Sequence, residues 1–444
     1  METESSKKRF HYSILLVGVL LIVAILGSAT THYRYSDPFY VTEVADRLIT
    51  EGRVDLEDFE DLDRIHPGQR VNVINGKPFH YYSIGVVVSH IPSIIIAKLM
   101  GLTPYKNDIT LQKYNSIAIL ALCWLTFGIS VFRFFQEPRL RYFALLMFLT
   151  SPIIGSLGSA HWNTTPALLI YFLALFLVLD IVYKDRTTQS RLLFLGFLLG
   201  STLFVRPTCI AASIPIGVIL LKRNKKAFFF VLGTAILTIF LWLGVTKTLY
   251  GAFIPSYFSA HNIHSYDTNT LTAFTGILFS PSRGFFIFAP LYLLVTAGFF
   301  RAYKKSMTSK DQMIGIVLLV WILVHWIGVV AFALKGGAWW GGWCFGPRLL
   351  VETLPMWFFL TCITQKYFHL KKSVLLRWAI LTTIIWGAFL NIIQSQYNPY
   401  SSYWNESISQ KNFPQVFWDW EYPQWLNDAQ RHDERLDKYG ITHF

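Results

Sequence analysis

The chain has 444 residues, of which 53% are hydrophobic and 15% are charged, and its formal net charge is +13. Apolar stretches long enough to cross a bilayer recur from Ile14 onward, and no soluble domain of ordinary size remains between them. This composition excludes a soluble globular protein. The positive charge is divided among short Lys and Arg clusters between the apolar stretches, which excludes a nucleic-acid-binding surface and is typical of cytoplasmic loops.

The first apolar run, Tyr12 to Ala29, follows three basic residues and is followed by a poor cleavage site, so we interpret it as a retained span. With every basic cluster on the cytoplasmic side, the sequence predicts an all-α polytopic membrane protein of about 11 transmembrane helices, with its N-terminus inside and its C-terminus outside. The predicted spans are residues 11–31, 114–135, 142–158, 164–183, 192–206, 207–221, 227–249, 284–303, 313–334, 348–365 and 373–394.

Residues 80–100 would invert every later basic cluster if they crossed the membrane. His90, Pro92 and three serines also make this segment less apolar than its neighbours. We therefore predict a re-entrant or juxtamembrane element with both ends outside. The domain organisation that follows is a transmembrane domain over 1–394, with an outer loop at 32–79, and a short aromatic-rich extracytoplasmic tail over 395–444.

The outer loop opens with Asp37 and Pro38, a pair typical of a helix start, with the Asp as N-cap and the Pro at the first position. An apolar stripe beginning at Val41 predicts an amphipathic helix in the membrane interface that ends at Gly52. Asp37 is either the cap of this helix or a catalytic carboxylate. The acidic run from Asp55 to Asp63 that follows is predicted to be solvated, although such a run can also hold a cation.

Arginines at the outer ends of predicted spans are the next feature, because a charge there marks a site or an ion pair unless the side chain reaches the headgroups. Arg206, Arg283 and Arg348 all lie beside Pro or Gly in apolar surroundings. Their planar guanidinium groups suit phosphate recognition. Glu352, four residues after Arg348, offers a competing salt bridge at helical spacing.

Histidines and tryptophans complete the outer face. His161 begins a predicted span and His261 lies in the 250–283 loop, but a lone interfacial His is commonly structural. Trp339, Trp340 and Trp343 stand in a glycine-rich loop, where the glycines would let a ligand approach the backbone. No disulfide framework, zinc cage, P-loop or dinucleotide motif is present.

These motifs together resemble the GT-C class of membrane glycosyltransferases, especially the aminoarabinose transferases and protein O-mannosyltransferases. "SDPFYVTEVADRL" is similar to their first-loop pattern, with Asp37 and Tyr40 in register, and "GKPFHYY" is similar to their Lys-Pro motif at Lys77. "LFSPSRGFFIFAP" and "WWGGWCFGPRLLVETLP" also look like stretches of bacterial members. The chain departs from the class at Pro38, where Glu is usual, and at "HWNTTP", where an Asp-Pro is expected.

The resemblance implies an enzyme of the cell (inner) membrane that transfers a sugar, with inversion, from a polyprenyl-phosphate donor to an extracytoplasmic lipid, glycan or protein acceptor. Asp37 would be the base, Lys77, Arg206, Arg283 and Arg348 would contact the donor phosphate, and the substrate contacts would be Tyr40, His161, His261, Trp339, Trp340 and Trp343. No resident cofactor is identified, and a divalent metal stays open. The alternatives are a lipid-linked-sugar flippase or transporter and a polysaccharide polymerase or ligase. The tail is expected to cover the outer mouth and bind the acceptor.

Overall fold

The computed structural model describes residues 4–33, 38–58, 71–80, 82–135, 137–253, 269–336, 339–367, 374–408 and 413–441. These residues are helical apart from loops and one two-stranded hairpin, which confirms the all-α prediction for this part of the chain. The helices of the first half are α1 (Glu4–Gly27), α2 (Val41–Thr50), α3 (Ile84–Leu99), α4 (Asp108–Phe134), α5 (Pro138–Leu149), α6 (Pro152–Leu157), α7 (Thr164–Lys184), α8 (Gln189–Val205), α9 (Ser213–Arg223) and α10 (Lys225–Tyr250).

The second half continues with α11 (Thr270–Phe279), α12 (Phe285–Phe288), α13 (Leu291–Lys305), α14 (Ser309–Gly336), α15 (Leu354–Tyr367), α16 (Val374–Ala388), α17 (Tyr400–Tyr403), α18 (Gln415–Trp418) and α19 (Ala429–Lys438). Short 3₁₀ turns precede α9 and α15, at Pro207–Ala212 and Arg348–Thr353, and a π-helical stretch, Phe389–Tyr397, extends α16. All eleven predicted spans coincide with helical stretches. Among the residues that the structure describes, five helices are long and apolar enough to cross a membrane, so the larger number of spans and the placement of the termini stay predictions.

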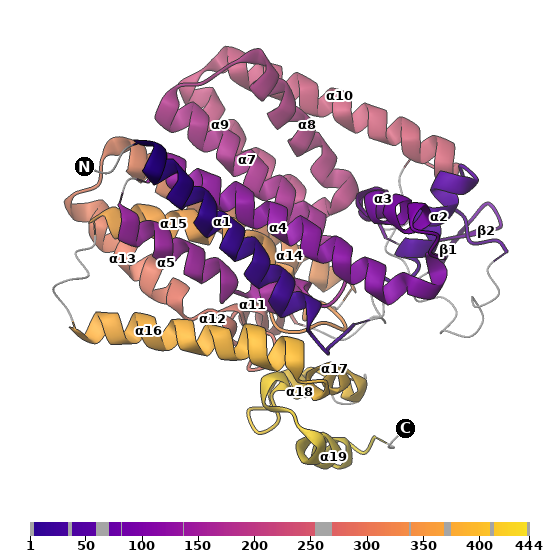
Figure 1. Cartoon of the computed structure of the whole chain (residues 1–444). Coiled ribbons are helices and arrows are strands. Elements are labelled where there is room, and N and C mark those ends of the chain that lie inside the picture. The colour runs from indigo at the N-terminus through magenta and orange to yellow at the C-terminus, as the bar shows by residue number, and fades with distance from the viewer. Residues whose placement is uncertain are drawn as a thin grey trace.

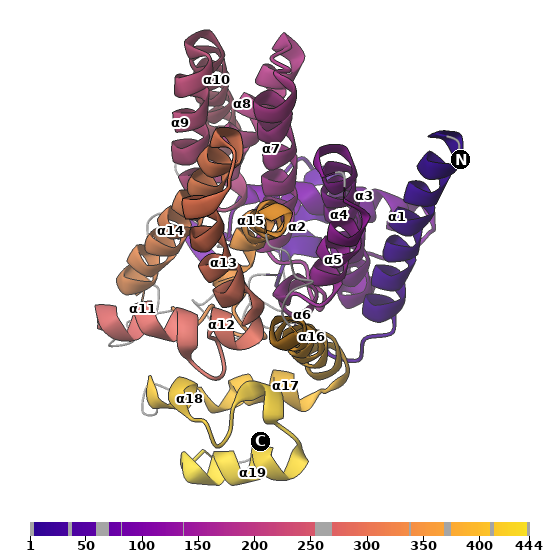
Figure 2. The same cartoon turned by 90° about the vertical axis from the view of Figure 1, so that its left-hand side faces the viewer.

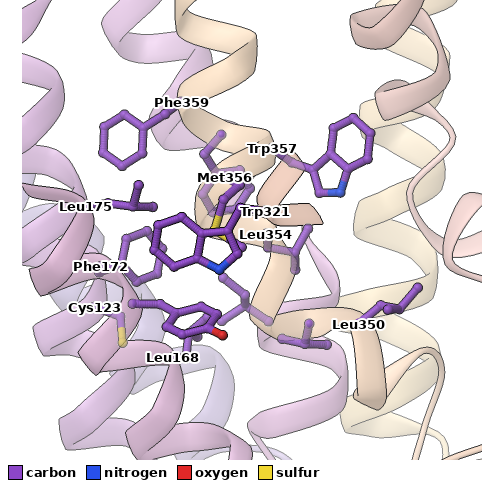
Figure 3. Close-up of a cluster of buried hydrophobic side chains, with 14 of the residues drawn as sticks. Cys123, Leu168, Phe172, Leu175, Trp321, Leu350, Leu354, Met356, Trp357 and Phe359 are labelled. Atoms are coloured by element: carbon purple, nitrogen blue, oxygen red, sulfur yellow. The ribbon is translucent and has the colours of Figure 1, made fainter. Parts of the chain in front are cut away.

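The core of the bundle lies around α15, whose residues Leu354 to Thr364 are all buried. Trp321 of α14 is fully buried and is surrounded by Leu168 and Phe172 of α7 and by Met356 of α15 (Figure 3). In contrast, α10 and α16 lie at the periphery with few of their side chains buried, as expected of helices that face lipid.

Charged residues of several basic clusters meet at the same end of the bundle. Asp180 of α7 forms ion pairs with Arg133 of α4 at 2.6 Å and with Arg191 of α8 at 2.7 Å. Asp311, at the start of α14, pairs with Lys366 at the end of α15 at 3.0 Å. This arrangement agrees with the prediction that these clusters share one side of the membrane.

The opposite end of α8 and α10 carries α2, α3 and the antiparallel hairpin of β1 (Val71–Ile74) and β2 (Lys77–His80) (Figure 1). A separate apolar cluster holds them there, in which Phe79 and Val87 pack with Phe204 and Tyr250. The segment predicted to be interrupted by His90 and Pro92 is a continuous helix, α3. It packs beside α2, and its juxtamembrane placement stays a prediction.

The start of α2 differs from the prediction. The helix begins at Val41, after a turn over residues 38–40, and Tyr40 has a φ of 65°. Because this positive φ interrupts helical geometry, Pro38 is not the first helical residue, and the N-cap position is that of Tyr40. The predicted start of the helix at Pro38 is therefore wrong.

The tail forms a separate layer below α11, α12 and the end of α16 (Figure 2). It contains α17, α18 and α19, and its Trp404 is fully buried. The chain after α16 is thus a folded cover and not a solvated extension.

Candidate functional site

Three consecutive residues of the turn between α6 and α7 organise the candidate site. His161, Trp162 and Asn163 are all fully buried, and each meets a different part of the chain. Ser151 caps α6 and Pro152 follows at its first position, so the chain re-enters the bundle as a short helix before this turn. The turn therefore joins elements that are far apart in the sequence.

His161 contacts α3 and α4. Its ring nitrogen lies 2.9 Å from Ser89 Oγ, the amide of Asn115 donates to it at 3.1 Å, and its ring stacks on His90 at a centroid distance of 5.2 Å. Burial lowers the pKa of His161 to about 4, because the charged imidazolium would lose its hydration. His161 is consequently a neutral hydrogen-bonding group at pH 7.

A buried carboxylate extends this polar cluster toward the start of α2. Thr42 Oγ1 lies 3.0 Å from His90 Nε2 and donates to Asp108, which also accepts from Gln112 at 2.7 Å. Gln112 donates in addition to the carbonyl of Pro38 at 3.0 Å. The residue next to Asp37 is thereby fastened to the cluster, while Asp37 itself lies outside the described residues.

This part of the site was not predicted, although the spacing of polar residues along α4 indicates it. Asp108, Gln112 and Asn115 stand at positions i, i+4 and i+7, which places three polar groups on one face of α4. Thr42 is polar but is fully buried with the apolar stripe of α2. It turns inward because its hydroxyl bridges His90 and Asp108.

Trp162 faces Arg348. The guanidinium carbon of Arg348 lies 4.2 Å from the centroid of the Trp162 ring, and one nitrogen donates to the carbonyl of Gly341 at 2.5 Å. Gly341 has a φ of 85°, so the loop needs glycine there to present this carbonyl. The side chain of Arg348 is only 4% exposed and therefore does not extend to the headgroups.

Asn163 faces Arg206, at the end of α8. Arg206 donates to the amide oxygen of Asn163 at 2.8 Å and forms an ion pair with the fully buried Glu352. The second carboxylate oxygen of Glu352 lies 3.7 Å from Nε2 of His325 on α14. Glu352 therefore pairs with Arg206 and not with Arg348. Residues 348–353 form a 3₁₀ turn, in which side chains four positions apart are not aligned as they are in an α-helix.

Arg283 and the tryptophan loop are engaged by the tail. Arg283 donates to Asn405 at 2.7 Å and also to Gln424, whose amide donates to the carbonyl of Cys344 at 2.9 Å. Arg283 therefore lies between the bundle and the tail.

All four cysteines of the chain are free and buried.

The tryptophans divide into two groups. Trp339 and Trp340 pack on Phe417 of the tail at centroid distances of 5.2 and 5.1 Å and are at most 5% exposed, whereas Trp343 is 37% exposed. This packing corrects the expectation that all three indoles face a ligand, because the tail occupies the surface of two of them. A Cβ at Gly346 would lie 2.9 Å from Phe288, so this glycine is needed for packing.

Lys77 and Tyr40 lie at the other edge of the site. Lys77 is exposed on the hairpin and pairs with Glu57 at 2.9 Å. Tyr40 is buried, with its ring edge-on to Phe39 at 4.4 Å. His261, like Asp37, lies outside the described residues.

The predicted solvated acidic run is corrected at its first residue. Asp55 is 6% exposed and forms an ion pair with Arg53 at 2.8 Å, which organises the loop around a buried carboxylate. Among the residues that the structure describes, no group of three His, Cys, Asp or Glu side chains is placed to hold a metal ion. The neighbours of His161 that the structure describes, Ser89, His90 and Asn115, do not form a set of metal ligands.

Comparison with known proteins reveals a distant structural likeness. No protein-family model and no curated protein sequence matches the chain. Among solved structures, it is similar to the archaeal oligosaccharyltransferase AglB from Archaeoglobus fulgidus, solved with an inhibitory peptide and a dolichol-phosphate, at 12% identity and a TM-score of 0.48. The match covers 94% of this chain and 60% of AglB. A likeness this distant does not establish a shared function.

Proposed function

We propose that the protein is an integral membrane glycosyltransferase that transfers a sugar, with inversion, from a polyprenyl-phosphate donor to an extracytoplasmic acceptor. The observation that carries the proposal is the convergence of buried polar groups on the turn of residues 158–163. Residues of α2, α3, α4 and α8 meet there with Arg348, at the end of the bundle that also carries the hairpin. Buried polar groups that gather at one end of an otherwise apolar bundle mark a site.

Asp37 is the proposed base. A carboxylate that removes the proton of an acceptor hydroxyl must be held within reach of it. The contact from Gln112 to the Pro38 carbonyl supports this role, because it fixes the backbone beside Asp37 against α4. Asp108, with hydrogen bonds from Thr42 and Gln112, is a positioning residue in this scheme.

Arg348 is the proposed contact for the phosphate that leaves the sugar. Its guanidinium is held by the Trp162 ring and the Gly341 carbonyl, so the charge is fixed in place before the reaction. Fixed cations stabilise the charge that develops on a leaving phosphate. Arg206 is less suited to this role because Glu352 neutralises it, and we assign it to holding the turn through Asn163.

The remaining predicted contacts have supporting roles in this proposal. Lys77, on the exposed hairpin, would contact the donor phosphate as it enters, and Trp343 would contact the sugar or prenyl chain. His161 and Tyr40 would contact the substrate, and the tail would bind the acceptor.

The test measures the release of polyprenyl phosphate from a panel of synthetic polyprenyl-phosphate sugars by the purified protein. Asp37→Asn is expected to slow release by about 10²–10⁴-fold, the usual contribution of a general base, without weakening donor binding. Asp46→Asn is the control, because Asp46 lies on the outer side of α2 and pairs with Lys98 at 2.6 Å. Unchanged release in Asp37→Asn would remove Asp37 from the reaction.

A transporter is the second candidate, and one observation favours it. His325 lies in the middle of α14 and joins the buried pair of Arg206 and Glu352, and ionisable groups inside a bundle are typical of transport pathways. A transporter would move the intact lipid-linked sugar. Transbilayer movement of the donor without any release of polyprenyl phosphate would establish this alternative.

A further inference from the structure

Two buried arginines, one in the tail and one in the bundle beneath it, contact the same aromatic ring. The guanidinium carbons of Arg435, on α19, and Arg283, before α12, lie 4.7 and 5.1 Å from the centroid of the Trp404 ring. Arg435 is fully buried and Arg283 is 2% exposed. Two positive charges are therefore held close together and away from water.

Hydrogen-bond acceptors account for only part of these charges, because Arg283 donates to Asn405 and Gln424 but Arg435 has no acceptor among the described residues. Within the described chain, Nε, Nη1 and Nη2 of Arg435 and Nε of Arg283 are buried without a hydrogen-bond partner. The carboxylates of Asp419 and Glu406 are near enough to act on the charge of Arg435, but among the described contacts neither forms an ion pair with it. Asp419 binds Lys438 at 2.9 Å and Tyr439 at 2.7 Å, and Glu406 lies 3.9 Å from His432. Removing two like charges from water without a directly bound counter-anion is unfavourable, and an indole ring offsets only part of that cost.

We propose that Arg283 and Arg435 form a binding site for one phosphate group, which is enclosed when the tail docks on the bundle. A phosphate carries close to two negative charges and three acceptor oxygens, which matches two guanidinium groups with unused N–H donors. The amides of Asn405 and Gln424 orient Arg283 toward this site. The inference does not depend on sugar transfer, and the phosphate belongs either to a free anion or to a lipid.

The experiment follows the thermal unfolding of the full-length protein in a neutral detergent, with inorganic phosphate titrated against chloride at constant ionic strength. Binding to the folded state is expected to raise the wild-type melting temperature by about 3 °C at one hundred times Kd. Arg435→Met should abolish this shift. Arg431→Met, one turn earlier on α19, should keep it, because Arg431 donates to the carbonyl of Glu421.

The melting temperature without phosphate separates a binding site from a structural contact. If the charge of Arg435 awaits an anion, Arg435→Met should unfold at the wild-type temperature or above it in phosphate-free buffer. A lower melting temperature there, with an undiminished phosphate shift, would overturn the proposal. A second titration with dodecyl phosphate identifies the source, since a shift with this probe alone assigns the site to a lipid phosphate. No shift with either probe in the wild type would also overturn it.

Discussion

At the scale of single residues, Arg206 and Arg348 reach the same turn but have different electrostatic surroundings. Arg206 is neutralised by the buried carboxylate of Glu352, whereas Arg348 is held by a tryptophan ring and a backbone carbonyl. Both are nearly inaccessible to solvent. The ion pair of Arg206 joins the end of α8 to the 3₁₀ turn before α15, whereas the role proposed for Arg348 is to contact the phosphate of the donor.

Arg348→Lys is expected to weaken donor binding by about 1–3 kcal/mol, because lysine keeps the charge but loses the planar fork that donates to phosphate. Titration of a polyprenyl-phosphate sugar against the purified variant measures this change. Wild-type affinity in Arg348→Lys would exclude this residue from the phosphate site.

Glu352→Gln provides the contrast, because it leaves Arg206 buried without its counter-charge. We expect it to destabilise the protein by about 3–5 kcal/mol, the usual effect of breaking a buried pair. The loss should appear in thermal unfolding and not as a specific loss of donor affinity in the protein that remains folded.

At the scale of elements, α3 determines how the rest of the chain is threaded. It packs beside α2 and contributes Ser89 and His90 to the polar cluster around His161. If both its ends lie outside, every later basic cluster lies on the cytoplasmic side. If it crosses the membrane, all of those clusters change sides.

Introduced cysteines distinguish these topologies, and the background is low because the native cysteines are buried. Cysteines replacing the exposed residues Lys106 and Thr270 are expected to react with an impermeant thiol reagent in intact cells, and one at Lys225 only after permeabilisation. Reaction at Lys106 only after permeabilisation would show that α3 is a span. That result would also make the predicted placement of the C-terminus wrong.

At the scale of the whole molecule, the tail is joined to the end of the bundle near α11 and α12 through a few polar contacts. Gln424 joins three parts of the chain, since it accepts from Arg283, accepts from the backbone of Gly346 at 3.1 Å and donates to the carbonyl of Ser401 at 2.8 Å. Trp339 and Trp340 pack against the same layer. The tail and the tryptophan loop are therefore coupled.

Gln424→Ala is expected to loosen this layer, because it leaves several buried polar groups unpaired at about 1–3 kcal/mol each. Hydrogen exchange should increase over residues 413–441 and in the loop at 339–347, while α15 stays protected. The matched control is Gln430→Ala, since Gln430 is exposed on α19 and bonds only Glu434 among the described residues. Equal exchange in the two variants would contradict the coupling.

The sequence alone determined the helical bundle and the approximate limits of its helices. Long apolar runs leave the backbone no other way to satisfy its hydrogen bonds in a membrane, so periodicity and length were sufficient. The candidate residues at the outer ends of helices were also visible, because an arginine beside Pro or Gly in apolar surroundings stands out at Arg206, Arg283 and Arg348. Asp108 could have been found from the spacing of polar residues on α4.

The tertiary structure alone decided which of these groups meet. The partner of Glu352 is Arg206, 146 positions earlier, and not Arg348 at helical spacing, because the 3₁₀ turn rotates the side chains apart. Trp339 and Trp340 are covered by the tail, and Arg435 is buried on Trp404, although nothing in the surrounding charged sequence indicates it. Ion pairs and aromatic contacts form between residues that folding brings together. The separation of two residues along the chain therefore does not predict whether they will pair.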